Sequence, residues 1–162
     1  MISKKVILTG SFGVGKSSLF NRFIYSQFND KYLTTIGVKV NKKSVDVNGQ
    51  ELSILLWDIA GEVTQDKVPV SYFLGASGII YVFDLSRPST YINIASDLQY
   101  LQRLLPNGTI RLVGNKRDLV TDEQLEKIKT EVPMMWNILT SAKTGENVEE
   151  MFLDLGAALL SI

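Results

Sequence analysis

The nine residues GSFGVGKSS, Gly10 to Ser18, constrain the fold of this chain more than any other segment. They follow the apolar run Val6–Gly10 and lead into Ser17–Tyr25, where apolar residues recur at helical spacing. Between a strand and a helix, the spacing G-x-x-x-x-G-K-S binds phosphate through backbone N–H groups and the helix N-terminus. We therefore expect a phosphate-binding loop here, formed by Gly13, Val14, Gly15, Lys16, Ser17 and Ser18.

Strand and helix patterns alternate along the rest of the chain. Strands are predicted at Val6–Gly10, Lys39–Val47, Leu52–Trp57, Ile79–Phe83, Ile110–Val113 and Met134–Leu139. Helices are predicted at Ser17–Tyr25, Tyr91–Leu105, Asp122–Thr130 (begun by a capping box at Thr121 and Gln124) and Val148–Leu160, with a fifth after Trp57. The Asn48-Gly49 turn makes the second and third strands an antiparallel hairpin.

This alternation predicts a single α/β domain over residues 1–162. We expect a three-layer P-loop NTPase architecture with six strands and five helices. The sheet would be mainly parallel with one antiparallel edge strand, and helices would cover both faces. In such sheets, ligands bind at the carboxyl ends of the strands.

Composition excludes several classes of function. The chain has no cysteine and no histidine, which rules out disulfides, thiolate metal sites and histidine catalysis. Lys+Arg and Asp+Glu both number 17, so no basic excess indicates a nucleic-acid partner. No apolar run reaches about 18 residues, and no signal-peptide pattern opens the chain. We expect a cytoplasmic protein without a transmembrane segment.

Three further polar clusters follow predicted strands: Asp58–Gly61, Asn115–Asp118 and Ser141–Lys143. A carboxylate such as Asp118 can accept hydrogen bonds from both N1–H and the 2-amino group of guanine, a pair that adenine does not offer. Asn115 could tie loops together, and the stem of Lys116 could lie over the base. On its own, the tetrapeptide NKRD (Asn115–Asp118) also fits a polar strand-to-helix turn.

Taken in order, these motifs resemble the Ras superfamily of small GTPases, and most of all its Rab branch. The resemblance runs from Lys4 to about Leu160. TTIGV and the pair Trp57-Asp58 favour Rab over Ras or Rho. The segments that carry it are GSFGVGKSS, FNDKYLTTIGVKV, WDIAGE, SYFLGASGIIYVFDLS, GNKRD and TSAKTGENVEEMF.

The resemblance implies a GTP-binding switch that uses Mg²⁺. Ser17, Thr35 and, through water, Asp58 would hold the metal, and Gly61 would contact the γ-phosphate. Guanine would be bound by Phe28, Asn115, Lys116, Asp118, Ser141, Ala142 and Lys143. Phe28 could instead be a core residue. Two loops, about 27–38 and 59–72, would be ordered by GTP and released after hydrolysis.

The resemblance also implies partner proteins that read these loops: effectors, exchange factors and activating proteins. Val40, Trp57 and Tyr72 occupy the positions of an aromatic effector-binding patch, with one aromatic missing, although Trp57 could be plain packing. VTQDKVPVS, which follows Glu62, lacks the family's acidic-arginine-aromatic run. No cysteine-bearing tail for lipid attachment is evident, so a peripheral membrane location would require a further tail.

Two residues depart from the family pattern. Phe12 stands where a small residue is usual, and Glu62 stands where a glutamine orients the attacking water. With Lys16, Gly61 and Glu62 as the catalytic residues, we expect slow hydrolysis, because Glu62 cannot donate as an amide does and Phe12 would crowd the γ-phosphate. Alternatively, Phe12 turns outward and packs on residues such as Ile59, leaving turnover ordinary.

The sequence also fits two other functions. One is an adaptor that holds GTP with little or no hydrolysis. The other is an ATP-dependent phosphotransferase, which would need an acceptor pocket and a lid, commonly with arginines. The five arginines are in no obvious lid; they are Arg22, Arg87, Arg103, Arg111 and Arg117.

Overall fold

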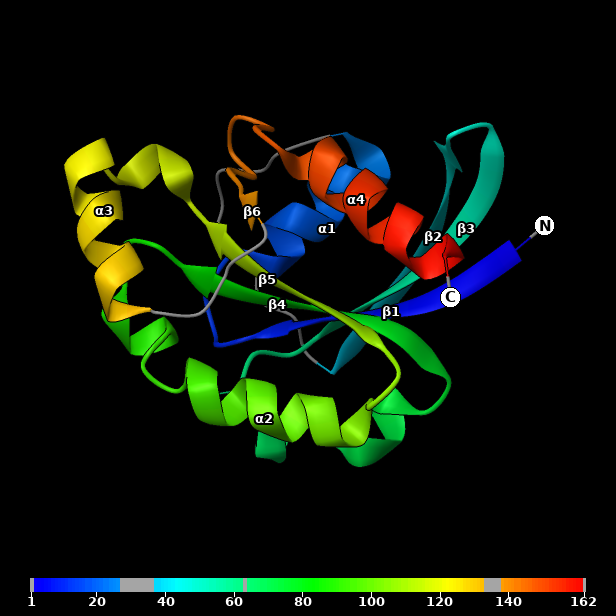
Figure 1. Ribbon diagram of the computed structural model, residues 1–162, viewed down its shortest axis with the longest axis horizontal. Coiled ribbons are helices and arrows are strands. Elements are labelled where there is room, and N and C mark those ends of the chain that lie inside the picture. The colour runs from blue at the N-terminus through cyan, green and yellow to red at the C-terminus, as the bar shows by residue number, and fades with distance from the viewer. Residues whose placement is uncertain (1, 27–36, 63, 133–137, 162) are drawn as a thin grey trace.

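The protein is built around a central β-sheet (Figure 1). The structure is a computed structural model, and it describes residues 2–26, 37–62, 64–132 and 138–161. The strand order is β2-β3-β1-β4-β5-β6. The strands are β1 (Ile2–Gly10), β2 (Val38–Val47), β3 (Gln50–Ile59), β4 (Ala76–Asp84), β5 (Thr109–Asn115) and β6 (Ile138–Leu139). Five of them are at least seven residues long, and β6 adds a two-residue edge parallel to β5.

Among the described strands, the one antiparallel pair is the predicted hairpin of β2 and β3. Its turn has φ values of 52° at Asn48 and 87° at Gly49. Two successive positive φ values match the right-handed twist of the flanking strands, which explains the Asn-Gly pair. The other pairings, β1 with β3 and β4, and β5 with β4 and β6, are parallel. The mainly parallel sheet with an antiparallel edge strand is therefore confirmed.

Helices cover both faces of the sheet, as Figure 1 shows. They are α1 (Lys16–Tyr25), α2 (Ile94–Leu104), α3 (Asp122–Glu131) and α4 (Val148–Leu160). The helices α1 and α4 share one face, where the rings of Phe23 and Phe152 stack with centroids 3.6 Å apart. The opposite face carries α2. This arrangement makes the three layers that the sequence predicts.

Successive residues of β1 enter opposite cores because side chains alternate across a strand. Val6 and Leu8 join the core under α1 and α4, and Ile7 joins the core under α2. All three are fully buried. Burial on both faces explains why the strands of a parallel sheet read as continuous apolar runs.

The predicted helix count is wrong: the described residues hold four α-helices, not five. Two short 3₁₀ turns, Gln65–Lys67 and Val70–Phe73, stand where the fifth was expected. Pro69 lies between them and disfavours helical backbone at Val68, whose ψ is 131°.

Two predicted boundaries also need correction. Helix α2 begins at Ile94 rather than Tyr91, because Pro88–Thr90 forms a separate 3₁₀ turn. Of the strand predicted at Met134–Leu139, Ile138–Leu139 is a strand, and residues 134–137 lie outside the described part of the chain. The capping box of α3 is confirmed, since Thr121 and Gln124 exchange side-chain-to-backbone hydrogen bonds of 3.1 and 2.8 Å.

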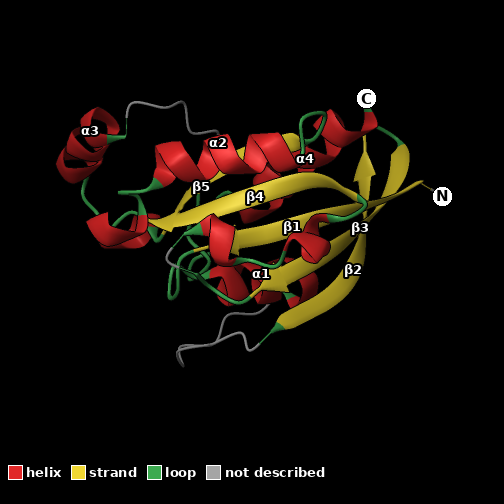
Figure 2. Cartoon of the chain, turned by 90° about the horizontal axis from the view of Figure 1, so that it is seen from below, coloured by secondary structure: helices red, strands yellow, loops and turns green. Residues whose placement is uncertain are grey.

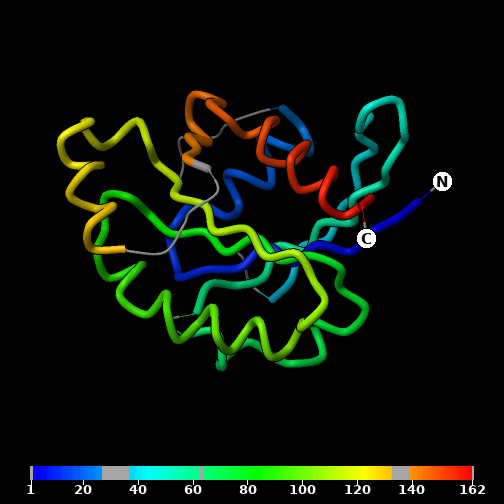
Figure 3. The backbone as a smooth tube through the Cα atoms, in the orientation of Figure 1, coloured from blue at the N-terminus to red at the C-terminus, as the bar shows by residue number. Residues whose placement is uncertain are grey.

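The two ends of the sheet carry different features. The turn of the β2–β3 hairpin and both ends of the chain lie toward one end, on the right of the tube in Figure 3. The carboxyl ends of β1, β4 and β5 point the other way, toward α3, as the view in Figure 2 also shows. The predicted polar clusters therefore gather at that second end. None of the described helices is long and apolar enough to cross a membrane.

Candidate nucleotide-binding site

The loop between β1 and α1 has the backbone of a phosphate-binding loop. Gly13 and Gly15 have φ values of 77° and 99°, a left-handed region that favours glycine. Gly15 immediately precedes α1 and has no side chain with which to cap it. The N–H groups of the first turn thus face the loop, and with the helix dipole they favour an anion.

Lys16 is held inside this loop and is only 5 % exposed. Burial lowers the pKa of Lys16 below its ordinary value, and the negative charge of Asp58 partly offsets the change. An ammonium that has lost most of its water is stabilised by any further anion beside it. The environment of Lys16 therefore suits contact with a phosphate group.

Ser17 and Asp58 bring the phosphate loop and the end of β3 together. The Ser17 hydroxyl donates to Asp58 Oδ2 over 2.8 Å, and both residues are buried. A hydroxyl and a carboxylate oxygen are the hard ligands that Mg²⁺ prefers, so the pair fits the ion. Among the described residues, no group of three or more acidic, histidine or cysteine side chains could hold a metal by itself.

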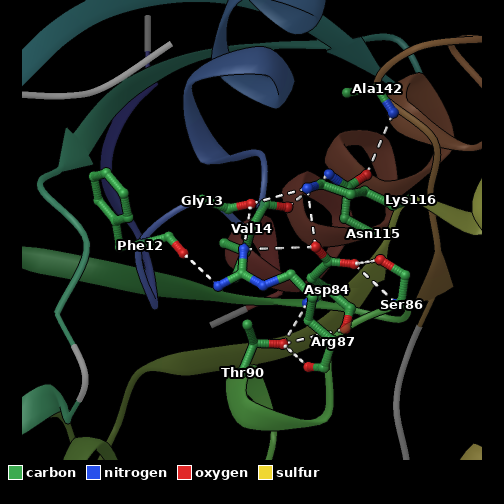
Figure 4. A network of polar contacts seen from close by, with 10 residues as sticks. All are labelled: Phe12, Gly13, Val14, Asp84, Ser86, Arg87, Thr90, Asn115, Lys116 and Ala142. Atoms are coloured by element: carbon green, nitrogen blue, oxygen red, sulfur yellow. Dashed lines mark hydrogen bonds and ion pairs between the residues drawn. The ribbon is translucent and has the colours of Figure 1, made fainter. Parts of the chain in front are cut away.

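Asn115, at the end of β5, links three loops. Its Nδ2 donates to the Val14 carbonyl over 3.0 Å. Its Oδ1 accepts from the Ala142 N–H over 3.3 Å (Figure 4). The same oxygen accepts from Thr140 Oγ1 over 2.9 Å. One amide side chain therefore fixes the phosphate loop relative to both predicted guanine-reading loops.

Asp118 is oriented by a buried hydroxyl. Ser141 Oγ donates to Asp118 Oδ1 over 2.7 Å and accepts from the Thr144 N–H over 3.1 Å. Asp118 itself is exposed, and so is Lys143. Arg22 of α1 holds the loop that carries Ser141 and Lys143. It donates to the carbonyls of Ala142 and Lys143 over 2.9 and 2.6 Å. The loop whose Ser141 orients Asp118 is thus itself held by α1.

The backbone after β3 lies directly against the phosphate loop. A Cβ at Gly61 would come within 2.5 Å of Phe12 Cα and 2.6 Å of Phe12 N, so only glycine fits here. The Glu62 N–H donates to the Gly10 carbonyl over 3.2 Å. Phe12 is 53 % exposed, and its ring points away from the polar groups drawn in Figure 4. Phe12, Gly61 and Glu62, which were all expected to affect hydrolysis, are therefore neighbours.

A buried polar network anchors Gln65, which sequence reasoning missed. The Gln65 N–H donates to Asp97 Oδ1 over 3.0 Å, and the Tyr81 hydroxyl donates to Asp97 Oδ2 over 2.8 Å. Thr9 Oγ1 also donates to Gln65 Oε1. All four residues are buried. The segment after Glu62 is thereby tied to β1, β4 and α2.

Replacing Asp97 by alanine should destabilise the protein strongly. The change leaves two buried donors, the Tyr81 hydroxyl and the Gln65 N–H, without their acceptor, at a cost of about 2–4 kcal/mol. At roughly 2–4 °C per kcal/mol for a chain of this length, thermal unfolding should fall by about 4–16 °C. Asp154→Ala is the control, because Asp154 is exposed and pairs with Arg111. Equal melting temperatures for the two variants would contradict the role of the network.

Asp97 also makes stability depend on pH. Burial raises the pKa of Asp97 above its ordinary value of 3.8, despite hydrogen bonds that lower it. Asp97 therefore holds its proton more tightly in the folded state than in the unfolded state. Its contribution to the free energy of unfolding is present below pH 3.8 and is lost as the pH rises through the raised pKa of the folded state. The free energy of unfolding of wild type minus that of Asp97→Asn should decrease across this window. A difference that stays constant would contradict the assignment.

The predicted patch of Val40, Trp57 and Tyr72 forms one surface. Val40 is 45 % exposed and pairs with Trp57 across β2 and β3. The rings of Trp57 and Tyr72 lie 6.4 Å apart, and both residues are half-buried. Lys5 Nζ lies 3.7 Å from the centroid of the Trp57 ring. The Trp57 ring is therefore covered on one side by the Lys5 ammonium and is only partly exposed to solvent.

Two predicted site residues, Phe28 and Thr35, lie outside the described residues. The others that were assigned to phosphate, magnesium or guanine meet at the carboxyl ends of β1, β3, β5 and β6. Sequence reasoning missed three supporting residues besides Gln65: Asp84, Arg87 and Thr140. Asp84 directly follows the buried run GIIYVF, so the rule that placed the other clusters would have found it.

Sequence comparisons with known proteins show the family of this chain. A family model described as the Ras family matches residues 5–161. Ras-related protein SEC4 of Saccharomyces cerevisiae is 37 % identical over 156 residues, covering 93 % of this chain and 72 % of SEC4. Ras-related protein Rab-4 of Dictyostelium discoideum is 39 % identical over 155 residues, covering 92 % of this chain and 75 % of that protein.

A human relative shows the same similarity. Ras-related protein Rab-4B of Homo sapiens is 37 % identical over 163 residues, covering 97 % of this chain and 76 % of Rab-4B. The matched residues, 5–161, span both the phosphate loop and the two loops predicted to read guanine. The chain therefore belongs to the Ras superfamily of small GTPases, as a Rab-like, GTP-binding molecular switch.

Proposed function

We propose that residues 1–162 act as one nucleotide-binding domain that binds GTP and GDP with Mg²⁺ and hydrolyses GTP slowly. One observation carries the proposal. Asn115 bridges the loop with phosphate-binding geometry and the loops with guanine-reading chemistry, through Val14 on one side and Ala142 on the other. A ligand with a guanine at one end and phosphates at the other matches that arrangement.

In this proposal, the phosphates lie on the N–H groups of residues 13–18, with Lys16 beside the outer phosphates. Asp118 accepts from N1–H and the 2-amino group of guanine, and the Ala142 N–H meets the O6 atom. The adjacent Ser141 holds Asp118 in place. Phe28 is assigned to the edge of the base from the family pattern alone.

The pair of Ser17 and Asp58 is proposed to hold magnesium, directly and through water respectively. Thr35 is assigned as a further ligand in the GTP state. The ion would neutralise charge that develops on the phosphates during hydrolysis. Since Mg²⁺ commonly keeps only one or two protein ligands, this small donor set is sufficient.

The switch is proposed to act through the Gly61 N–H, which would contact the γ-phosphate. Gly61 already packs against the backbone of Phe12, so a γ-phosphate contact there would fix the segment that follows. That segment carries Glu62 and the anchored Gln65. GTP would thus favour the ordered arrangement of the switch loops, because its γ-phosphate makes it bind that arrangement more tightly than the disordered one.

Slow hydrolysis is the expected consequence of Phe12 and Glu62. An ionised glutamate only accepts hydrogen bonds, so it cannot donate to the γ-phosphate while it orients water. It also brings a negative charge near another one. The backbone of Phe12 lies against Gly61 and its side chain is exposed, so in this proposal the ring obstructs an arginine from an activating protein.

The variant Phe12→Gly/Glu62→Gln should hydrolyse bound GTP at least about tenfold faster than wild type, because a positioned water and an open site are restored. Single-turnover conversion of GTP to GDP measures the rate. Glu51→Gln is the matched control, since Glu51 is exposed in the hairpin. If the double variant is no faster than this control, the roles given to Phe12 and Glu62 are wrong.

The nucleotide that co-purifies with the protein separates slow turnover from a GTP-locked adaptor. Mostly GDP, identified by mass spectrometry, supports the proposed hydrolysis. Mostly GTP, retained over hours in magnesium buffer, supports the adaptor instead. The same nucleotide contacts would serve both functions, so binding affinity alone does not separate them.

We further propose that Val40, Trp57 and Tyr72 contact effector proteins. A half-buried tryptophan and tyrosine beside an exposed valine have the composition of an interface core. Tyr72 belongs to the second 3₁₀ turn after Gly61, so its position can respond to the nucleotide. Exchange factors and activating proteins would approach the same loops.

A further inference from the structure

Two cationic side chains hold the outer side of the phosphate loop (Figure 4). Arg87 Nη2 donates to the Phe12 carbonyl and Nη1 donates to the Gly13 carbonyl, both over 3.1 Å. Lys116 Nζ donates to the Gly13 carbonyl over 2.9 Å. Arg87 comes from the segment after β4. It therefore links the end of β4 to the phosphate loop, in addition to the ends of β3 and β5.

Asp84 orients both cations. Its carboxylate is fully buried and forms an ion pair with Lys116 at 2.9 Å, with Arg87 Nη1 at 3.8 Å. The Asp84 Oδ1 atom accepts from the Ser86 N–H and hydroxyl over 2.8 and 2.6 Å. Asp84 is thus fixed within its own turn.

The backbone that carries Arg87 is also fixed. Thr90 Oγ1 accepts from the Asp84 N–H over 2.9 Å and donates to the Arg87 carbonyl over 2.8 Å. The Arg87 N–H donates to the Asp84 carbonyl over 3.0 Å. Because the turn is closed at both ends, the guanidinium reaches the loop from a defined position.

The geometry of a peptide unit turns these carbonyl contacts into control of N–H groups. In a planar trans peptide, the C=O of one residue and the N–H of the next point in opposite directions. A donor on the Phe12 carbonyl therefore directs the Gly13 N–H to the other side, and a donor on the Gly13 carbonyl directs the Val14 N–H. Gly13 has a φ of 77° and no Cβ, so its own side chain does not restrict the peptide groups on either side of it.

We propose that Arg87 is a positioning residue that holds the Gly13 and Val14 N–H groups toward the bound phosphates and thereby slows nucleotide release. The inference rests on the proposed function, because it assumes phosphates on the inner side of the loop. Arg87 touches only the outer side, so it acts through the backbone and not on the phosphates directly. Its guanidinium forms two parallel contacts, which a single ammonium cannot reproduce.

Arg87→Ala should release GDP about 5- to 30-fold faster than wild type, as expected for two lost hydrogen bonds that are partly exposed to water. The measurement is displacement of a fluorescent GDP analogue by excess GDP, in magnesium buffer and again with EDTA. The fold increase should persist in EDTA, because Arg87 acts on the peptide groups and not on the metal pair. An increase seen only with magnesium would overturn the proposal.

Two further variants test whether the effect depends on both Arg87 contacts and whether it is specific to Arg87. Arg87→Lys should release GDP at an intermediate rate, at least about twofold above wild type, because one amine can replace one of the two contacts. Arg111→Ala, which removes an arginine paired with Asp154, should release GDP at the wild-type rate. If Arg87→Ala does not fold, Arg87→Lys alone decides.

Wild-type rates in the Arg87 variants, or equal acceleration in Arg111→Ala, overturn the proposal. A wild-type protein that binds no guanine nucleotide would instead overturn the proposed function, so the two failures are distinguishable.

Discussion

Replacing Gly15 by alanine is expected to weaken binding of both GTP and GDP by at least about 100-fold. An alanine Cβ would lie 2.3 Å from Asn115 Nδ2, far inside contact distance. Relief requires either the loop or Asn115 to move, which breaks the bond to the Val14 carbonyl. Charge-assisted hydrogen bonds contribute about 1.5–3 kcal/mol each, so misdirecting two phosphate contacts accounts for this loss.

Gly49→Ala separates the clash from backbone strain. Gly49 has a φ of 87°, close to the 99° of Gly15, but nothing lies within 4 Å of a Cβ built there. Both variants should therefore be slightly destabilised, and only Gly15→Ala should lose affinity. Equilibrium titration with fluorescent GTP and GDP analogues measures the difference. Wild-type affinity in Gly15→Ala would contradict the close packing of the two loops.

Replacing Asp118 by asparagine is expected to lower affinity for GTP by roughly 10- to 200-fold, the value of a two-point hydrogen-bonded contact. The asparagine amide group would face the donors of guanine with donors of its own. Xanthine has a carbonyl in place of the 2-amino group, so the same variant should bind XTP more tightly than wild type does. Competition of both nucleotides against fluorescent GDP measures the change of preference.

Asp122→Asn is the matched control for this change. Asp122 lies close in the sequence, is highly exposed and pairs with Arg117 away from the proposed base. It should keep the preference for GTP. If Asp118→Asn retains wild-type selectivity, guanine is read elsewhere, and an ATP-dependent phosphotransferase becomes a serious alternative again.

Most of the fold follows from local patterns in the sequence. Apolar runs that end in glycine, aspartate and asparagine mark β1, β4 and β5 respectively, and the Asn48-Gly49 turn fixes the hairpin. The prediction of a fifth helix was wrong because the segment after Gly61 has little helical pattern and contains Pro69. That segment is held by tertiary contacts from Gln65 to Asp97, which lie 32 residues apart. No local pattern predicts such a pairing.

The candidate site follows from motifs to a similar extent. Lys16, Ser17, Asp58 and Asn115 were predicted, and they meet where parallel strands end. Arg87 was not predicted, because its role depends on reaching carbonyls 74 and 75 residues away. Likewise, nothing in the sequence indicates that Lys5 lies over the ring of Trp57. Side-chain contacts between distant segments are the part that requires coordinates.

The most direct test of the account is equilibrium binding of GTP, GDP, ATP and ADP to the wild-type chain in magnesium buffer. A site that hydrogen-bonds guanine should reject adenine strongly, because its polar groups would be left unpaired. We predict saturable binding of GTP and GDP at least about 1,000-fold tighter than binding of ATP and ADP. Equal affinity for the four nucleotides, or no saturable binding of any, would contradict the account.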